Sequence, residues 1–217
     1  MPDPILFGAA YSVYVRIARL ALAEKGVAYR LAEIDIFAEG GPPAEYAARQ
    51  PFGRIPAFEH DGFRLYESGA ITRYVDEAFA GPPLQPQDPR ERARVNQILS
   101  ILDSYAYRTL VWDIYIERMR AAENGRVSDE ARIAAALSRA ETCLGALEAL
   151  MADAPWLAGP ALTLADLHAA PIFAYGMMAP EGRALVARHG AIQDWWERMA
   201  RRPSMAATRF PREQSAQ

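Results

Sequence analysis

The chain has 217 residues, which is enough for one large domain or two small ones. Its composition, 51% hydrophobic and 24% charged, is that of a globular protein and excludes a disordered or fibrous one. The net charge of −3 argues against a nucleic-acid partner, because such a partner requires a basic surface stripe.

The start of the chain and its single cysteine favour a cytoplasmic protein. Met1 is followed by Pro-Asp-Pro, without the basic and apolar stretches of a signal peptide. No window approaches the roughly 18 consecutive apolar residues of a membrane span. Cys143 has no second cysteine with which to form an internal disulfide, and this fits a reducing compartment. We therefore expect no association with a membrane.

The first eighty residues alternate between strand and helix patterns. The apolar run "PILFGA" predicts a buried strand, and the spacing that follows predicts a helix ending at Lys25-Gly26. The remaining elements are expected as a strand at 29–36, a short helix at 44–49, a hairpin at 55–66 that turns at Asp61-Gly62, and a helix at 68–79. The order is therefore β-α-β-α-β-β-α, an α/β domain over residues 1–80.

The second part of the chain carries helical patterns. Residues 81–89, "GPPLQPQDP", contain four prolines in nine positions and are predicted to be an interdomain linker. Beyond them helices are expected at 90–124, 128–152, 163–178 and 191–201. The sequence thus predicts an α/β domain followed by an all-helical domain over residues 90–217.

The segment "PFGRIPAF" contains a proline at the start of a hairpin strand. A trans Pro56 would waste a position of the hydrogen-bond ladder, whereas a cis bond would turn the Ile55 backbone outward from the sheet. The alternative is an ordinary edge-strand proline. If the bond is cis, the Ile55 backbone is available to a ligand.

Two further segments lie at predicted helix starts. Glu67 and Ser68 follow a strand directly, so backbone N–H groups there can bind a carboxylate or phosphate, while Ser68 is also a candidate N-cap. Thr163 and Asp166 have the spacing of a capping box. We interpret this second pair as structural.

In combination these segments resemble a soluble glutathione S-transferase. The resemblance rests on "RQPFGRIPAFEHDGFRLYESGAITRYVDEAF", the proline-rich linker, the helices and "WLAGPALTLADL", and it covers essentially the whole chain. It indicates a bacterial-like member of uncertain class. It implies a thioredoxin-like N-terminal domain, an all-helical C-terminal domain, a homodimer and a role in detoxification. It also implies glutathione as co-substrate, with its sulfur near the start of the first helix.

The resemblance assigns roles to residues of the N-terminal domain. It implies that Pro56 is the family's cis-proline and that the Ile55 backbone pairs with the cysteinyl part of glutathione. Glu67 and Ser68 match the pair that holds the γ-glutamyl end. Arg54 takes the position of a polar side chain that often reaches glutathione.

The attacking thiolate needs a hydrogen-bond donor. A free thiol has a pKa of about 8.5, and lowering it by about two units requires about 2.7 kcal/mol in favour of the thiolate. A helix start supplies about 0.3–1 kcal/mol and one hydrogen bond to a charged group about 1.5–3 kcal/mol. One donor is therefore about enough.

The family's serine position departs from the pattern in this chain. In the serine-type classes the catalytic serine lies six residues before the valine matched by Val15, and here that position is Ala9, which cannot donate. The remaining donors are the Ser12 hydroxyl, then the Tyr11 hydroxyl, and the backbone N–H groups. Ser12 is equally expected as the helix N-cap, and Tyr11 as a wall of the pocket or an exposed loop residue.

The electrophile is expected against the long helix after the linker. On α-helical spacing Tyr105, Arg108 and Trp112 share one face, an apolar wall with one cation. The alternative is that these aromatic side chains belong to the core or to a dimer interface.

No metal site is expected. His60, His168 and His189 lie apart and lack a carboxylate or cysteine cluster at ligand spacing. His168 is expected as a hydrogen-bonded core histidine and Cys143 as a small buried hydrophobe.

The predicted function is that of a glutathione S-transferase which activates the thiol of glutathione for attack on a small apolar electrophile. Peroxidase, thiol-transfer or dehalogenase chemistry would use the same thiolate. The alternative is a non-catalytic glutathione-transferase-like binding module, which Ala9 favours and the intact "RIP" and "ES" segments oppose.

Overall fold

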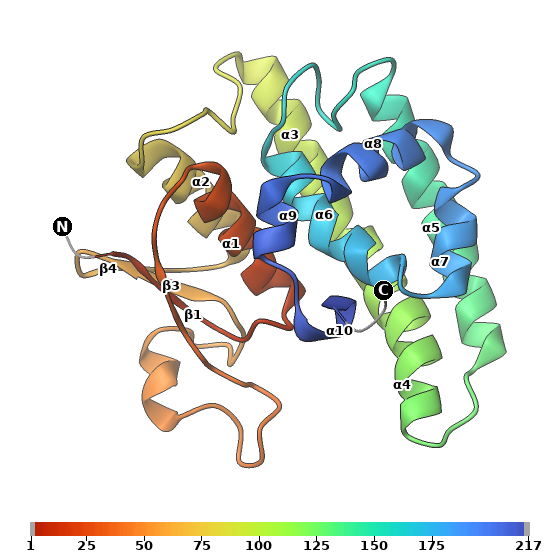
Figure 1. Cartoon of the computed structure of the whole chain (residues 1–217), viewed down its shortest axis with the longest axis horizontal. Helices are drawn as coiled ribbons and strands as arrows, with labels where there is room; N and C mark the ends of the chain where they lie inside the picture. The colour runs from red at the N-terminus through yellow and green to blue at the C-terminus, as the bar shows by residue number, and fades with distance from the viewer. Residues whose placement is uncertain (1–2, 215–217) are drawn as a thin grey trace. The chain divides into compact units, whose positions relative to one another are not determined.

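The structure is a computed structural model that describes residues 3–214, apart from the side chains of residues 120, 122, 211 and 214. Figure 1 labels most of its helices and strands. The chain divides into two compact units, of which the first comprises Met1–Leu84 with Pro203–Gln217 and the second Gln85–Arg202. The expected fold class, a thioredoxin-like domain and an all-helical one, is confirmed.

The first unit is built on a four-stranded mixed sheet. Its strands are β1 (Ile5–Phe7), β2 (Arg30–Ala32), β3 (Ala57–His60) and β4 (Phe63–Tyr66). The order in the sheet is β2-β1-β3-β4, with β1 and β2 parallel and the other neighbours antiparallel. The strand expected at 29–36 is shorter, because β1 offers only three residues as ladder partners.

The hairpin of β3 and β4 forms as expected. Asp61 and Gly62 both have positive φ, 48° and 79°, the backbone conformation of a two-residue type I′ turn. The register then pairs Ala57 with Tyr66. Pro56, which precedes Ala57, and Glu67, which follows Tyr66, therefore lie at the same end of the sheet.

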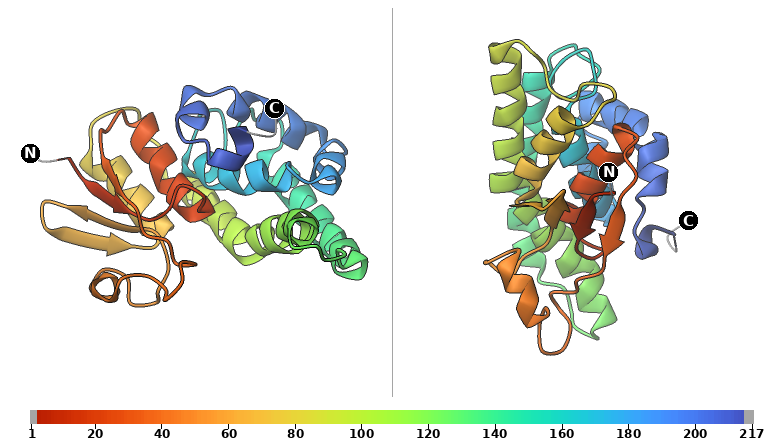
Figure 2. Two further views of the ribbon diagram at one scale, coloured as in Figure 1. Left: turned by 60° about the horizontal axis from the view of Figure 1, so that its bottom comes forward. Right: turned by 90° about the vertical axis from the view of Figure 1, so that its left-hand side faces the viewer.

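Two helices cover one face of this sheet, α1 (Val13–Glu24) and α2 (Ser68–Ala78), and they pack against each other. The short 3₁₀ helix η1 (Ala44–Ala48) lies on the other side (Figure 2). The core between the helices and the sheet is apolar, and its fully buried side chains include Leu6, Ile17 and Ile71.

The end of the chain joins the first unit. Helices α9 (Pro203–Ala207) and α10 (Pro211–Gln214) group with the sheet, and α9 packs against α1 (Figure 1). From the sequence, these residues were predicted to belong to the helical domain. The physical reason for the difference is Arg16, a fully buried cation of α1 whose hydrogen-bond partners lie in this segment.

The second unit consists of helices. They are α3 (Pro89–Ile101), η2 (Leu102–Ile116), α4 (Glu117–Glu123), α5 (Glu130–Met151), α6 (Leu164–Gly176), α7 (Pro180–Val186) and α8 (Gly190–Ala200). The first three continue one another, as expected for 90–124, but η2 has the wider turns of a π-helix. The short helices α7, α9 and α10 were not predicted. Among the helices described for residues 3–214, none is long and apolar enough to cross a membrane.

Helix α6 is the centre of this unit, since all of its residues are buried. The predicted capping box is confirmed: the Thr163 side chain accepts from the Ala165 N–H, and Asp166 accepts from the Thr163 N–H at 2.7 Å. Asp166 also accepts from the Leu157 N–H and from Nε1 of Trp195, each at 2.9 Å. The box therefore ties a loop and helix α8 to the start of α6.

Candidate functional site

Three segments predicted to bind a ligand meet at one end of the sheet. The register pairs Phe7 with Ala57 and Ala57 with Tyr66. At this end of the sheet, Gly8 follows β1, Pro56 precedes β3 and Glu67 follows β4. The loop before α1, the proline segment and the start of α2 are therefore neighbours.

The loop from β1 to α1 is compact. Gly8 has a φ of 153°, and a Cβ there would lie 2.4 Å from Cγ2 of Val15 and 3.3 Å from Cβ of Ile55, so only glycine fits. Ala9 is fully buried, and its carbonyl accepts from the Ser12 N–H at 3.0 Å. The Ala9 methyl group therefore has no contact with solvent. The turn instead brings Ser12 to the helix start.

Ser12 is the N-cap of α1. Its Oγ accepts a hydrogen bond from the Val15 N–H at 3.3 Å, and the residue is half-buried. Because capping uses a lone pair of the hydroxyl, its hydrogen remains able to donate to another group. The capping role and the donor role that the sequence left open are therefore compatible.

The Tyr11 hydroxyl is committed elsewhere. It donates to Oδ1 of Asp35 at 2.5 Å, and the same oxygen accepts from the Phe37 N–H at 2.8 Å. Burial of the phenol, then the hydrogen bond and charge of Asp35, raise the pKa of Tyr11 well above its usual value. The Tyr11 ring lies 5.9 Å from that of Phe37, which is exposed. Sequence reasoning missed this role of Asp35, which lies 24 residues further along the chain.

The Ile55–Pro56 peptide bond is cis, as expected, and both residues are buried. Arg54 has an exposed side chain, and its backbone is held on both sides: the N–H donates to Oε1 of Gln50 at 3.2 Å, and the carbonyl accepts from the Tyr46 hydroxyl at 2.8 Å. Gln50 and Tyr46 are buried supports of the segment that sequence reasoning missed.

The start of α2 differs in detail from the prediction. Glu67, with a φ of 70°, is the N-cap residue, and Ser68 is the first residue of the helix and is buried. Ser68 is therefore not the cap. The Glu67 carbonyl accepts from the N–H groups of Ala70 and Ile71 at 3.0 Å each. The N–H groups of Ser68 and Gly69 lie before these, at the helix start, where backbone donors and the helix dipole favour an anionic group.

The three residues predicted to line an electrophile pocket belong to η2 in the second unit. Tyr105 is 64% exposed, Trp112 is half-buried, and Nε of the exposed Arg108 lies 3.0 Å from Oδ1 of Asp113. The prediction of a shared face assumed α-helical spacing. A π-helical turn contains more residues, so this assumption does not hold here.

The other candidate side chains, His168 and Cys143, are buried in the protein interior. His168 is buried with Nε2 2.8 Å from Oδ1 of Asp103, as expected for a hydrogen-bonded core histidine. Cys143 is buried, and burial raises the pKa of its thiol to about 11. Over the part of the chain that the structure describes, no group of three or more His, Cys, Asp or Glu side chains is arranged to hold a metal ion.

Comparison with known proteins gives matches over most of the chain. The family model described as "Glutathione S-transferase, N-terminal domain" matches residues 6–83. The model described as "Glutathione S-transferase, C-terminal domain" matches residues 90–203. The chain is 30% identical to glutathione S-transferase F9 of Arabidopsis thaliana, covering 88% of this chain and 89% of that protein. It is 31% identical to glutathione S-transferase 4 of Zea mays, covering 94% and 90%.

A solved structure agrees with the sequence matches. Glutathione transferase F7 from Populus trichocarpa superposes with a TM-score of 0.84 at 29% identity, covering 94% of this chain and 97% of that one. These relatives are plant enzymes, so the expectation of a bacterial-like member is not supported. The predicted function agrees with the names of the relatives. With both of its halves matched, the chain belongs to the glutathione S-transferase family.

Proposed function

We propose that this protein is a glutathione transferase in which the Ser12 hydroxyl donates a hydrogen bond to the sulfur of glutathione and so stabilises the thiolate. The observation that carries the proposal is the state of the two hydroxyl groups beside the start of α1. The Ser12 hydroxyl uses a lone pair to cap the helix and keeps its hydrogen, whereas Tyr11 donates its hydrogen to Asp35.

We propose that glutathione lies across the end of the sheet where the three segments meet. The Ile55 backbone beside the cis bond pairs with the cysteinyl part, and Glu67 and Ser68 hold the γ-glutamyl end. Arg54 supplies an exposed cation to a carboxylate of the tripeptide. The free-energy requirement is met by one donor, because a hydrogen bond to the thiolate and the helix start together supply about 2–4 kcal/mol.

The experiment compares the wild-type protein with Ser12→Ala and Tyr11→Phe variants. The thiolate absorbance of bound glutathione is titrated against pH. Ser12→Ala should raise the apparent pKa of the bound thiol by about one to two units, because it removes about 1.5–3 kcal/mol of thiolate stabilisation. Tyr11→Phe should leave that pKa nearly unchanged. A shift with Tyr11→Phe and none with Ser12→Ala would contradict the proposal.

The electrophile is proposed to be small and apolar, with conjugation as the reaction. The Tyr11 ring and the exposed Phe37 ring form an apolar surface next to Ser12, and they support this choice. Tyr105, Arg108 and Trp112 remain proposed contacts of the electrophile. Peroxidase, thiol-transfer and dehalogenase activities would use the same thiolate and belong in the same substrate screen.

Class, assembly and location are also proposals. The plant relatives favour the plant phi class. Exposed aromatic side chains on the first unit favour a homodimer: Phe52 is 69% exposed, Phe63 50% and Tyr66 39%, and rings of this kind are enriched in protein interfaces. We further propose a glutathione-binding domain at 1–80 that the segment from Pro203 completes, a linker at 81–89, a helical domain over 90–202, a cytoplasmic location and a role in detoxification.

A further inference from the structure

The C-terminal segment, defined here as Pro203–Glu213, follows the length of α1. At the C-terminal end of the helix, the Ser204 hydroxyl donates to Oε1 of Glu24. In its middle, the Arg19 guanidinium donates to the carbonyl of Ala207 at 3.4 Å and to that of Thr208 at 3.3 Å. The segment therefore runs from the end of α1 toward its start.

Near the start of the helix the contact is made by Arg16, which is only 1% exposed. Each branch of its guanidinium has a partner in the C-terminal segment: Nε donates to Oγ1 of Thr208 at 3.3 Å, Nη1 to Oε1 of Glu213 at 2.6 Å, and Nη2 to the Met205 carbonyl at 3.2 Å. Glu213 also accepts from the Phe210 N–H, at 3.3 Å. A buried guanidinium without such partners would have to move toward water.

Arg16 is joined directly to the residue proposed to activate the thiol. Its backbone N–H donates to the Ser12 carbonyl at 2.9 Å, which is the first hydrogen bond of the helix. The Ser12 hydroxyl in turn caps that same first turn. A displacement of Arg16 toward solvent would therefore carry the first turn, and Ser12 with it, away from its position.

We propose that the C-terminal segment positions Ser12 for thiolate stabilisation, and that it does so by holding Arg16 through Glu213. Arg16 and Glu213 are positioning residues in this scheme and do not touch glutathione. The inference rests on the proposed function, because it assumes that the Ser12 hydroxyl is the donor to the sulfur.

The sign of one measurement separates positioning from electrostatics. Replacing Glu213 by alanine removes a negative charge from the neighbourhood of the helix start. Acting through charge alone, this change would favour the thiolate and lower the apparent pKa of bound glutathione. Misplacing the Ser12 hydroxyl would weaken its hydrogen bond and raise that pKa. A rise therefore has to come from geometry.

The test measures kcat, KM for glutathione and the apparent pKa of the bound thiol in Glu213→Ala and Glu213→Gln variants. Glu213→Ala should lower kcat by about tenfold, the scale expected for a sub-ångström misplacement, and raise the thiol pKa by about half a unit or more. KM should change less, because the proposed glutathione contacts lie on other elements. Glu213→Gln keeps an acceptor for Arg16 and should recover most of the loss.

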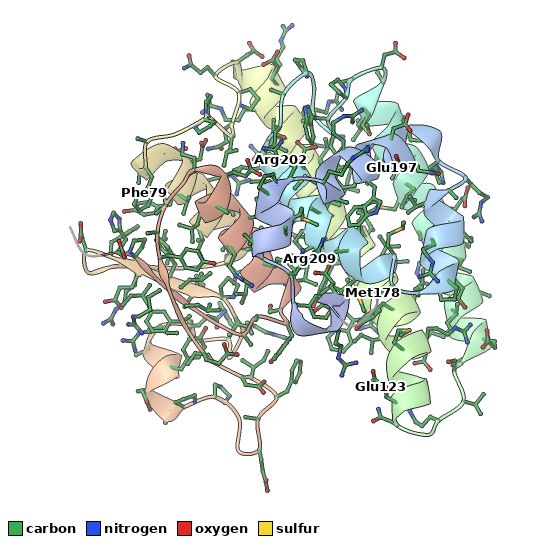
Figure 3. The ribbon with its side chains drawn as sticks, in the orientation of Figure 1. Phe79, Glu123, Met178, Glu197, Arg202 and Arg209 are labelled. Carbon is green, nitrogen blue, oxygen red and sulfur yellow. The ribbon has the colours of Figure 1, made fainter. Side chains whose placement is uncertain are left out.

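Two controls share features with the Glu213→Ala variant. Glu197→Ala removes an exposed carboxylate of α8 that lies 3.7 Å from Nη2 of Arg201, and Arg209→Ala changes an exposed side chain within the C-terminal segment itself (Figure 3). Both should leave kcat and the thiol pKa unchanged. Melting temperature is recorded for all variants, since a purely structural role would lower it without moving the thiol pKa.

The outcomes can be assigned separately. If Ser12→Ala raises the thiol pKa and Glu213→Ala leaves it unchanged or lowers it, the positioning role is overturned while the proposed function stands. If Ser12→Ala itself has no effect, the proposed donor is wrong, and with it the route through Arg16. A rise in the thiol pKa with both variants supports both statements.

Discussion

Asp113 shows how a single buried carboxylate can organise one surface of the helical unit. Its side chain is 6% exposed, and it accepts from Nε of Arg108 at 3.0 Å, from Nη2 of Arg132 at 2.7 Å and from Nη2 of Arg139 at 3.0 Å. Burial alone would raise the pKa of this carboxyl. The hydrogen bonds and charges of the arginines outweigh burial, so the pKa lies below its usual value.

A pKa lowered in the folded state means that the folded protein favours the ionised form of Asp113. This contribution to stability is present above the unfolded pKa of about 3.9 and is lost as the pH falls through the folded value. Asp113→Asn should therefore destabilise the protein at pH 7. We expect a loss of about 1–2 kcal/mol, because the arginine partners are 37–66% exposed and solvent screens their charges.

The measurement is urea unfolding of wild type and Asp113→Asn from pH 7 to pH 2. The difference between them should shrink below about pH 4. Asp194→Asn, at an exposed position on α8, is the matched control and should follow the wild type throughout. A stability difference that stays constant down to pH 2 would show that the charge of Asp113 is not responsible.

At the scale of elements, the start of α6 carries a larger share of the stability than its capping motif suggests. Asp166 is fully buried and serves the Leu157 N–H, the Thr163 N–H and the Trp195 indole together. Removing the carboxylate leaves several buried donors without an acceptor at once. An unmatched donor of this kind costs about 1–3 kcal/mol.

Asp166→Ala should therefore lower the free energy of unfolding by about 3–5 kcal/mol, measured by urea denaturation. The control is Asp129→Ala, which removes the exposed N-cap carboxylate of α5. Within residues 3–214 this carboxylate accepts a hydrogen bond only from the Arg132 N–H. Its loss should cost about 1 kcal/mol. Equal losses for the two variants would mean that the contacts to Leu157 and Trp195 contribute nothing.

Local chemistry explains which elements could be predicted from the sequence. The hairpin follows from Asp61-Gly62 because the turn conformation is a property of those two residues. The start of α6 follows from the spacing of Thr163 and Asp166 for the same reason. Partners distant in sequence set the features that were missed. Strand β2 is short because β1 is short, and the wide turns of η2 have no marker in the sequence.

The residues of the candidate site likewise divide into those that could be predicted from the sequence and those that depend on distant partners. The cis bond at Pro56 could be predicted from the family resemblance, whereas the strand pattern alone also allowed an ordinary edge-strand proline. The choice between Ser12 and Tyr11 could not, because it depends on a hydrogen bond from Tyr11 to Asp35, far along the chain. The prediction that Ser68 is the N-cap was wrong, because Glu67, with its positive φ, takes the cap position and the helix begins at Ser68.

At the scale of the whole molecule, the first unit is built from both ends of the sequence. A cut in the predicted linker should therefore not release it. We expect a protein with a protease site inserted between Leu84 and Asp88 to stay associated after cleavage, because the C-terminal segment on one fragment packs on α1 of the other.

Size-exclusion chromatography of the cleaved protein under native conditions checks this prediction. The two fragments should elute together. A cleaved Arg19→Ala, Ser204→Ala double variant, which loses contacts on α1, should separate more readily at the same concentration. Complete separation of the unsubstituted fragments would contradict the expected association.

The position of Glu213 also sets an order of events during protein synthesis. A ribosome makes the sheet and α1 early, yet the partner that neutralises Arg16 is encoded close to residue 213 and emerges after the entire helical unit. Domains generally fold as units while the chain is being made, N-terminal first. Here the earliest-made unit must wait for the latest-made segment, so the nascent chain carries an incomplete first unit until translation has passed residue 213.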